Sequence, residues 1–180
     1  MAGLRKMPIL AVALAGALSA VAQPVPAQNA DSCTAVDDTA LPPEFAGWNK
    51  VPTPVAAAAS ADAKAPALEI GTPAAITLLP DGAVRFATPP EQVRSRPGGH
   101  SGIVSVRIPA AGKWRVSAGS PVWIDLAGPG GRAVSTAHGH GPACSSIRKF
   151  VDFDLQPGDY VLQLSGNPGA DLRLLLSAIR

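Results

Sequence analysis

The sequence contains few of the residues that carry chemistry. It has three histidines and two cysteines among 180 residues, and aromatic residues make up only 4%. The Gly-x-Ser-x-Gly motif that exposes the nucleophile of many serine hydrolases does not occur. Serine, histidine and aspartate are common in secreted domains of this size, so their presence alone does not indicate a Ser-His-Asp hydrolase. We therefore assign no catalytic residue and favour a protein that is not an enzyme.

A strong net charge is also missing. The formal charge is +2, and two of the basic residues, Arg5 and Lys6, precede a hydrophobic N-terminal stretch. The remaining 13 basic and 13 acidic side chains give no indication of a nucleic-acid partner. Residues 23–91 carry three basic and eight acidic side chains, whereas residues 92–180 carry ten and five. These parts could pair with each other, or the basic part could bind an anionic ligand such as lipopolysaccharide or an acidic glycan.

The first 22 residues have the layout of a secretory signal peptide. Arg5 and Lys6 form a short positive region, and the apolar run from Pro8 to Val21 follows. This leader ends with the cleavage signal Ala-Val-Ala at residues 20–22. The apolar run is too short for a stable membrane span. We therefore expect residues 1–22 to be removed, the mature chain to have no membrane span, and the protein to be periplasmic or secreted.

Proline and alanine dominate residues 23–66. Seven prolines in this stretch argue against a long helix or a central strand. We expect an extended N-terminal arm here, in which Phe45 and Trp48 are apolar anchors that pack on the domain. The domain itself is expected over residues 67–180.

No segment of ten residues shows a convincing helical period. Instead, apolar residues recur with a period of two along six segments after residue 100, namely 102–108, 112–118, 121–127, 149–155, 159–165 and 171–179. The last of these segments is apolar on both faces. Turns rich in glycine and proline separate the segments about every eight to twelve residues. The pattern predicts an all-β domain, an antiparallel β-sandwich or jelly roll of about eight strands.

One further hairpin is predicted before residue 100. The apolar segments 76–79 and 83–87 flank Pro80-Asp81-Gly82, whose residue types are typical of a tight turn. We expect the two segments to form neighbouring strands.

The aromatic residues of the predicted strands fall into two groups by parity. Trp114 and Phe153 share the parity of the aliphatic core residues and are expected inside the sandwich. Trp123 and Phe150 have the opposite parity. Exposed rings on a flat sheet could stack on a sugar, so both are candidate ligand contacts. The alternative is a second buried face or contact with the N-terminal arm.

Two adjacent cations, Arg148 and Lys149, lie at the start of the predicted strand 149–155. They are candidate contacts for an anionic group of a ligand. The alternative is that they pair with Asp152 and Asp154 on the same segment.

The stretch AHGHGPACSS, residues 137–146, contains two histidines and one cysteine. In an extended segment His138 and His140 point the same way, with Cα atoms about 6.5–7 Å apart, so both imidazoles could reach one ion. Cys144 could add a thiolate, and this ligand set suits copper or zinc. Because metal sites usually need a third ligand and His100 is the only other histidine, a site for copper, zinc or iron stays an alternative.

A disulfide is the other interpretation of this stretch. An exported chain meets an oxidising compartment, and Cys33 and Cys144 are its two cysteines. Their bond would close a loop of about 111 residues, worth about 4–5 kcal/mol in the chain-entropy model, and would tie the arm to the domain. An oxidised Cys144 could not serve as a thiolate ligand or nucleophile, which would leave His138 and His140 with a structural role.

Several segments resemble a group of short exported proteins of Gram-negative bacteria, namely LPPEFAGW, PGGHSG, AGKWRV, LQPGDYVLQLSGN and, most specifically, AHGHGPACSSIRKFVDF. The resemblance covers nearly the whole chain after the leader and implies export, but no activity. Some members carry the label homogentisate 1,2-dioxygenase, which would imply iron held by two histidines and a glutamate. In cupin-like metal proteins the glutamate follows the His-x-His pair after four or five positions, where this chain has Cys144 and Ser145.

The sequence therefore predicts an exported, non-enzymatic β-sandwich of the periplasm or envelope, without a cofactor. Its partner would be an envelope component, a glycan or a protein. The alternative is a small metalloprotein that uses His138, His140 and His100 for copper or zinc handling, or as an iron-dependent oxygenase.

Overall fold

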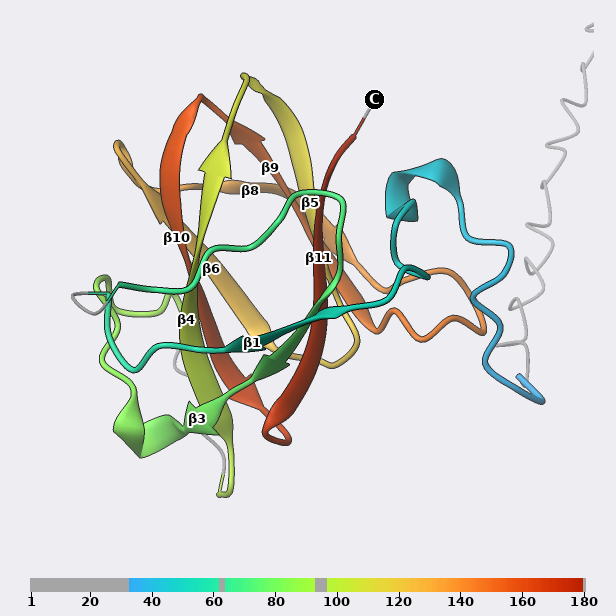
Figure 1. Cartoon of the computed structure of the whole chain (residues 1–180), viewed down its shortest axis with the longest axis horizontal. Helices are drawn as coiled ribbons and strands as arrows, with labels where there is room; N and C mark the ends of the chain where they lie inside the picture. The colour runs from blue at the N-terminus through green and yellow to red at the C-terminus, as the bar shows by residue number, and fades with distance from the viewer. Residues whose placement is uncertain (1–32, 62–63, 93–96, 180) are drawn as a thin grey trace, which may run out of the picture. The chain divides into compact units, whose positions relative to one another are not determined.

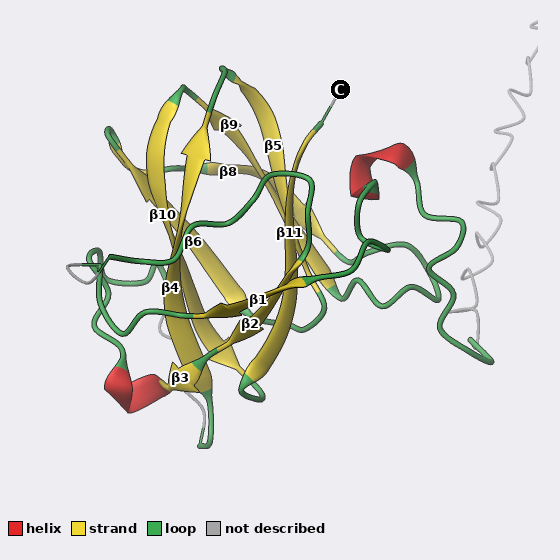
Figure 2. Ribbon diagram, in the orientation of Figure 1, coloured by secondary structure: helices red, strands yellow, loops and turns green. Residues whose placement is uncertain are grey.

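The computed structural model describes residues 33–61, 64–92 and 97–179. The predicted signal peptide, residues 1–22, and the first part of the predicted arm lie outside them. The described residues form two short 3-10 turns and eleven strands (Figures 1 and 2): η1 Pro43–Phe45, β1 Thr53–Ala56, β2 Ala74–Thr77, β3 Leu79–Pro80, η2 Asp81–Ala83, β4 His100–Ile108, β5 Gly112–Ala118, β6 Trp123–Gly128, β7 Gly131–Arg132, β8 Ser135–Gly139, β9 Lys149–Leu155, β10 Gly158–Asn167 and β11 Asp171–Ala178. Neither helical turn of this described part approaches the length of a membrane-spanning helix.

The strands form two sheets. The six-stranded sheet has the order β1-β2-β11-β5-β9-β8, and the five-stranded sheet has the order β3-β4-β10-β6-β7. Every strand pair of the described part is antiparallel except β1 with β2. The predicted all-β sandwich is confirmed. It has more strands than expected because β1, β3 and β7 are pieces of only two to four residues.

Strand alternation explains the core between the sheets. The inward positions carry the aliphatic residues of both sheets, such as Val104 of β4 and Val116 of β5, which are fully buried. Trp114 and Phe153 lie in the same core, as their parity predicts. Burial of each such side chain is worth about 1.5–3 kcal/mol, so this continuous core is the main source of stability.

The hairpin predicted around Pro80-Asp81-Gly82 is wrong. β2 lies in the six-stranded sheet between β1 and β11, whereas β3 pairs with β4 in the five-stranded sheet. Residues 83–87 form no strand, and their Arg85 makes an isolated bridge with Ser60. Ile76 of β2 is 1% exposed in its own sheet, so tertiary pairing outweighs the local turn preference.

Part of the predicted arm belongs to the sandwich. From Thr53 onward the chain forms β1, and Ala58 then pairs with Ile103 of β4. β1 contains Pro54 and lies at the edge of its sheet, where a missing backbone donor is tolerated. Residues 33–52, which we call the strap, lie outside the named strands.

The strap covers the outer face of the six-stranded sheet. Its Phe45 and Trp48, the two expected anchors, are 4% and 1% exposed and form a second apolar cluster with Ile147 and Leu175. Leu175 lies between two inward-facing residues of β11 and therefore points outward. This arrangement accounts for the apolar character of both faces of the last segment.

Residues 84–92, which we call the cover loop, lie against the outer face of the five-stranded sheet. Gln163 is an outward residue of β10, and it both accepts a hydrogen bond from Thr88 N and donates one to Thr88 O, at 3.0 and 2.8 Å. Further along the loop, Glu91 N donates to Asp125 of β6 at 3.3 Å. Each sheet thus has a non-strand segment against its outer face.

Candidate functional site

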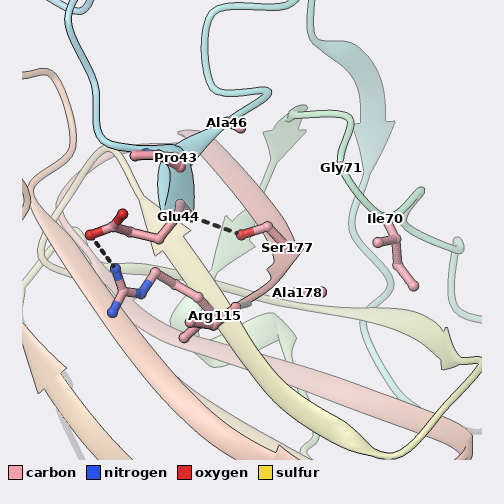
Figure 3. A pocket seen from close by; sticks show the side chains of 9 residues that line it. Pro43, Glu44, Ala46, Ile70, Gly71, Arg115, Ser177 and Ala178 are labelled. Carbon is pink, nitrogen blue, oxygen red and sulfur yellow. Dashed lines mark hydrogen bonds and ion pairs between the residues drawn. The ribbon is translucent and has the colours of Figure 1, made fainter.

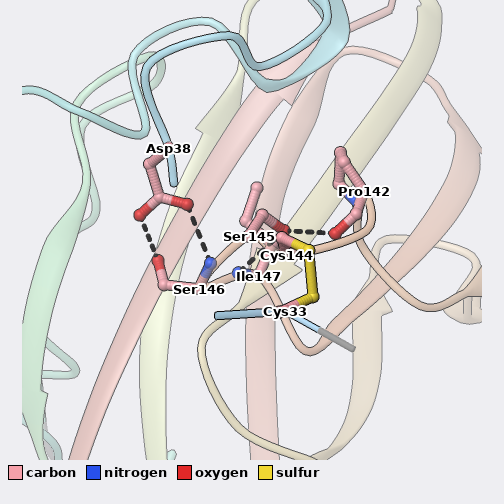
Figure 4. Close-up of a disulfide and its surroundings, with 7 residues drawn as sticks. All are labelled: Cys33, Asp38, Pro142, Cys144, Ser145, Ser146 and Ile147. Atoms are coloured by element: carbon pink, nitrogen blue, oxygen red, sulfur yellow. Dashed lines mark hydrogen bonds between the residues drawn. A yellow bond between two sulfur atoms is a disulfide. The ribbon is translucent and has the colours of Figure 1, made fainter. Parts of the chain in front are cut away.

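The stretch that contains the two histidines ends in a disulfide-bonded turn. Cys33 and Cys144 are joined, with Sγ atoms 2.05 Å and Cα atoms 5.3 Å apart, as the sequence predicts (Figure 4). Asp37 N donates to Cys144 O at 2.7 Å, and the Asp38 carboxylate accepts hydrogen bonds from the N–H and hydroxyl of Ser146. The Cys144 sulfur is therefore part of a cross-link and not a thiolate.

The histidines are not gathered around one point. His138 lies on β8 and is exposed, whereas His100 begins β4 in the other sheet. His140 has its Nδ1 3.2 Å from the carbonyl oxygen of Arg148. Within the ranges that the structure describes, no group of three His, Cys, Asp or Glu side chains could hold a metal ion. His100 is thus not brought in as a third ligand for the other two.

A cleft of about 410 Å³ lies where an edge of one sheet faces an edge of the other. We call it the Trp123 cleft. Trp123 comes from β6 of the five-stranded sheet, whereas His138 of β8 and Lys149 of β9 come from the six-stranded sheet. The lining residues are Glu91, Gln92, Pro121, Val122, Trp123, Ile124, Asp125, Ala133, Ser135, His138, Lys149, Val151 and Phe153. Three residues singled out from the sequence therefore meet in one place.

Lys149 connects the two sides of the Trp123 cleft. Its Nζ atom donates to the carbonyl oxygen of Val122 at 3.0 Å and lies 4.8 Å from the centre of the Trp123 ring. An ammonium group at this distance from an aromatic face is attracted by the ring electrons. The cleft therefore contains an aromatic ring and a cation in a defined arrangement.

Asp125 is the residue of the cleft that sequence reasoning missed. It is 4% exposed, and its Oδ2 accepts hydrogen bonds from Trp123 Nε1 at 3.1 Å and from Glu91 N at 3.3 Å. Arg132 Nε lies 3.7 Å from Oδ1. Burial raises the pKa of Asp125, and this effect is opposed by the Glu91 N–H, by the charge of Arg132 and by Trp123.

The sequence contained a partial signal for Asp125. It alternates with core residues and shares the parity of Trp123, so both were expected on one face of the strand. The sequence does not indicate the cover loop that buries this face, because the alternation in residues 83–87 is typical of a strand.

The other two predicted contacts lie elsewhere. Phe150 packs in the cluster under the strap, where its ring meets that of Phe45 edge to face, with centroids 6.1 Å apart. Arg148 is exposed, its N–H donates to Ala118 O at 2.9 Å, and its carbonyl oxygen faces His140. Neither residue lines the Trp123 cleft.

In comparisons with known proteins, the chain matches no family model and no curated protein. The resemblance to exported proteins of Gram-negative bacteria stays a prediction.

Proposed function

We propose that this protein is an exported, non-enzymatic binding protein of the periplasm or envelope, and that its ligand is an envelope glycan that enters the Trp123 cleft. One observation carries the proposal: Trp123, Lys149 and His138, from different sheets, line the same cavity. Its volume of about 410 Å³ lies in the range of small-molecule sites, about 300–1,000 Å³.

The lining chemistry suits a sugar. An aromatic ring such as that of Trp123 offers an apolar face to the C–H side of a pyranose. Hydroxyl groups both donate and accept hydrogen bonds, and the cleft offers a carboxylate acceptor in the exposed Glu91, an ammonium donor in Lys149 and an imidazole in His138. The mixture of both charges favours a polar ligand over a purely apolar one.

Two features support export. The predicted leader has the composition of a signal peptide. The Cys33–Cys144 disulfide is of the kind that forms and persists outside the reducing cytosol. Cell fractionation with N-terminal sequencing tests this part, and we expect a periplasmic or secreted protein that begins near residue 23. A protein that stays in the cytoplasm with its leader uncleaved would contradict export.

Tryptophan fluorescence is a direct test of the glycan. Trp48 and Trp114 are 1% and 6% exposed, whereas Trp123 is half-buried at the cleft, so a bound sugar changes mainly the Trp123 emission. The purified protein is titrated with a disaccharide from peptidoglycan and with the oligosaccharide part of lipopolysaccharide. We expect a saturable emission change with at least one of them.

The same titration, followed by calorimetry, is repeated with two variants. Trp123→Ala should weaken binding at least tenfold. Phe150→Leu is the matched control, because Phe150 is aromatic and close in sequence to Lys149 but lies under the strap, and it should leave the affinity unchanged. The glycan proposal fails if neither probe binds, or if Trp123→Ala binds as tightly as the wild type.

A further inference from the structure

A second cavity, of about 690 Å³, lies under the strap at the end of β11 (Figure 3). We call it the Arg115 pocket. Its walls come from η1, from the loop before β2, from the middle of β5 and from the end of β11, and the lining residues are Pro43, Glu44, Ala46, Ile70, Gly71, Arg115, Ser177, Ala178 and Ile179. None of these residues lines the Trp123 cleft, so the two cavities are separate.

Arg115 is held firmly on one side of this pocket. Its Nε and Nη2 donate to the two carboxylate oxygens of Asp152 at 2.7 and 2.8 Å. The guanidinium carbon lies 4.9 Å from the ring centre of Phe45 and 4.0 Å from that of Phe150. A bidentate partner together with two rings leaves the guanidinium little freedom. The hydrogen bonds that Arg115 donates to Asp152 also raise the pKa of Arg115, so it stays charged.

The third nitrogen of Arg115, Nη1, faces Glu44 and not Asp152. Nη1 lies 3.9 Å from Oε1 of Glu44, which is too long for a hydrogen bond. Figure 3 shows the Glu44 carboxylate beside this nitrogen, and Ser177 bonded to the backbone of Glu44. A fixed donor and an acceptor therefore lie side by side, at a spacing that one polar group with both functions can bridge.

The backbone of β11 is open beside the same pocket. Ile179 N donates to Lys113 O at 2.9 Å, so Ile179 faces β5. Bonded and non-bonded residues alternate in an antiparallel pair, and the N–H and C=O of Ala178 therefore point away from β5. Ala178 is exposed and belongs to the pocket lining.

No strand of the described part continues along this side of β11. β2 pairs with β11 only from Asp171 to Leu174. Beyond that point Gly71 N donates to Leu176 O at 2.8 Å. An unpaired strand edge is a template for another extended chain.

We propose that the Arg115 pocket binds an extended polypeptide segment of a partner protein, which adds as a short strand beside Ala178 and bridges Arg115 and Glu44 with its peptide groups. This inference is independent of the Trp123 cleft. The walls of Ile70 and Ile179 would receive an apolar side chain of the segment.

The charges around the pocket favour peptide groups over a free ion. Arg115 pairs with Asp152 and lies beside Glu44, and the Nζ atom of Lys50 donates to the Gly71 carbonyl at the pocket wall. The sum of these four formal charges is zero. A small anion or cation gains little in such surroundings, whereas a peptide backbone supplies both donors and acceptors without charge.

Peptide display provides the test. Random dodecapeptides displayed on phage are selected on the purified protein, and the selected sequences are synthesised and titrated by calorimetry. We expect Ala178→Pro, which removes the outward N–H, to weaken binding at least tenfold, and Glu44→Ala to weaken it several-fold. Trp123→Ala is the matched control and should leave peptide binding unchanged.

A second measurement does not depend on a variant. Hydrogen exchange followed by NMR should show the Ala178 amide exchanging at least tenfold more slowly when a selected peptide is bound. The proposal is overturned if no dodecapeptide binds, or if Ala178→Pro and the Ala178 exchange rate are both without effect. Displacement of the peptide by the peptidoglycan disaccharide at this pocket would also overturn it, since the site would then recognise hydroxyl groups.

Discussion

The two outer faces of the sandwich are covered by segments that differ in how they are held. The strap lies on the six-stranded sheet with the rings of Phe45 and Trp48, which are buried with Leu175, and its N-terminal end is cross-linked at Cys33. The cover loop lies on the five-stranded sheet through hydrogen bonds, with Gln163 as its main partner. An outward residue of either sheet therefore need not be exposed.

The cover loop also provides partners for buried polar side chains near the Trp123 cleft. Gln163 and Asp125 are 1% and 4% exposed, yet each is satisfied by backbone groups of the cover loop. Arg132 adds a hydrogen bond to the carbonyl oxygen of Pro89. Buried polar groups with partners are tolerated, but they add less stability than the same area of apolar contact. The strap should therefore be the more strongly held of the two segments.

Removal of the cross-link should have the largest effect on this comparison. In the double variant Cys33→Ser/Cys144→Ser the loop of 111 residues is no longer closed, and the chain-entropy model predicts a loss of about 4–5 kcal/mol in the free energy of unfolding. Urea unfolding of the variant and of the reduced wild type measures it, and the two should agree. Unchanged stability would show that aromatic packing alone holds the strap.

Removal of the side chain that holds the cover loop should have a smaller effect. Gln163→Ala leaves the N–H and C=O of Thr88 without their partner, and an unsatisfied buried group costs about 1–3 kcal/mol. Urea unfolding gives the loss, and hydrogen exchange of residues 84–92 shows whether the loop is released. Gln156→Ala, at an exposed turn, is the control and should be near neutral. A loss as large as that of the cysteine variant would contradict the ranking.

The smallest effect on stability is expected from Asp125, the buried carboxyl beneath the cover loop. Because burial raises the pKa of Asp125, the folded state holds the proton of this carboxyl to higher pH than the unfolded chain, whose aspartates titrate at about 3.9. The wild type therefore loses stability as the pH rises through this window, whereas Asp125→Asn does not. The stability of the variant minus that of the wild type should increase from acidic to neutral pH. Urea unfolding across this range checks it, and a decreasing difference would contradict the assigned cause.

Residue parity predicted which faces the strand residues occupy, and it succeeded where packing follows from alternation. Trp114 and Phe153 are in the core, and Trp123 shares its face with Asp125. The uneven charge distribution predicted that the acidic and basic parts could pair, and Glu44 of the acidic part does lie beside Arg115 of the basic part.

Parity could not predict what covers a face or which sheet a strand joins. The segment 83–87 alternates like a strand, but it lies in the cover loop region because β2 finds its partners in the other sheet. Phe150 has an outward position but is covered by Phe45, which is 105 positions earlier in the chain. Contacts over such separations leave no local pattern, so the division of the predicted contacts between the cleft and the strap could not be foreseen.

The strap has a consequence for the order in which the molecule is completed. Synthesis proceeds from the N-terminus, so Cys33 emerges 111 residues before the thiol with which it pairs. Leu175, against which the strap packs, belongs to the last strand of the described chain. The segment made first among those described is thus the one that can reach its final position only after the last strand exists.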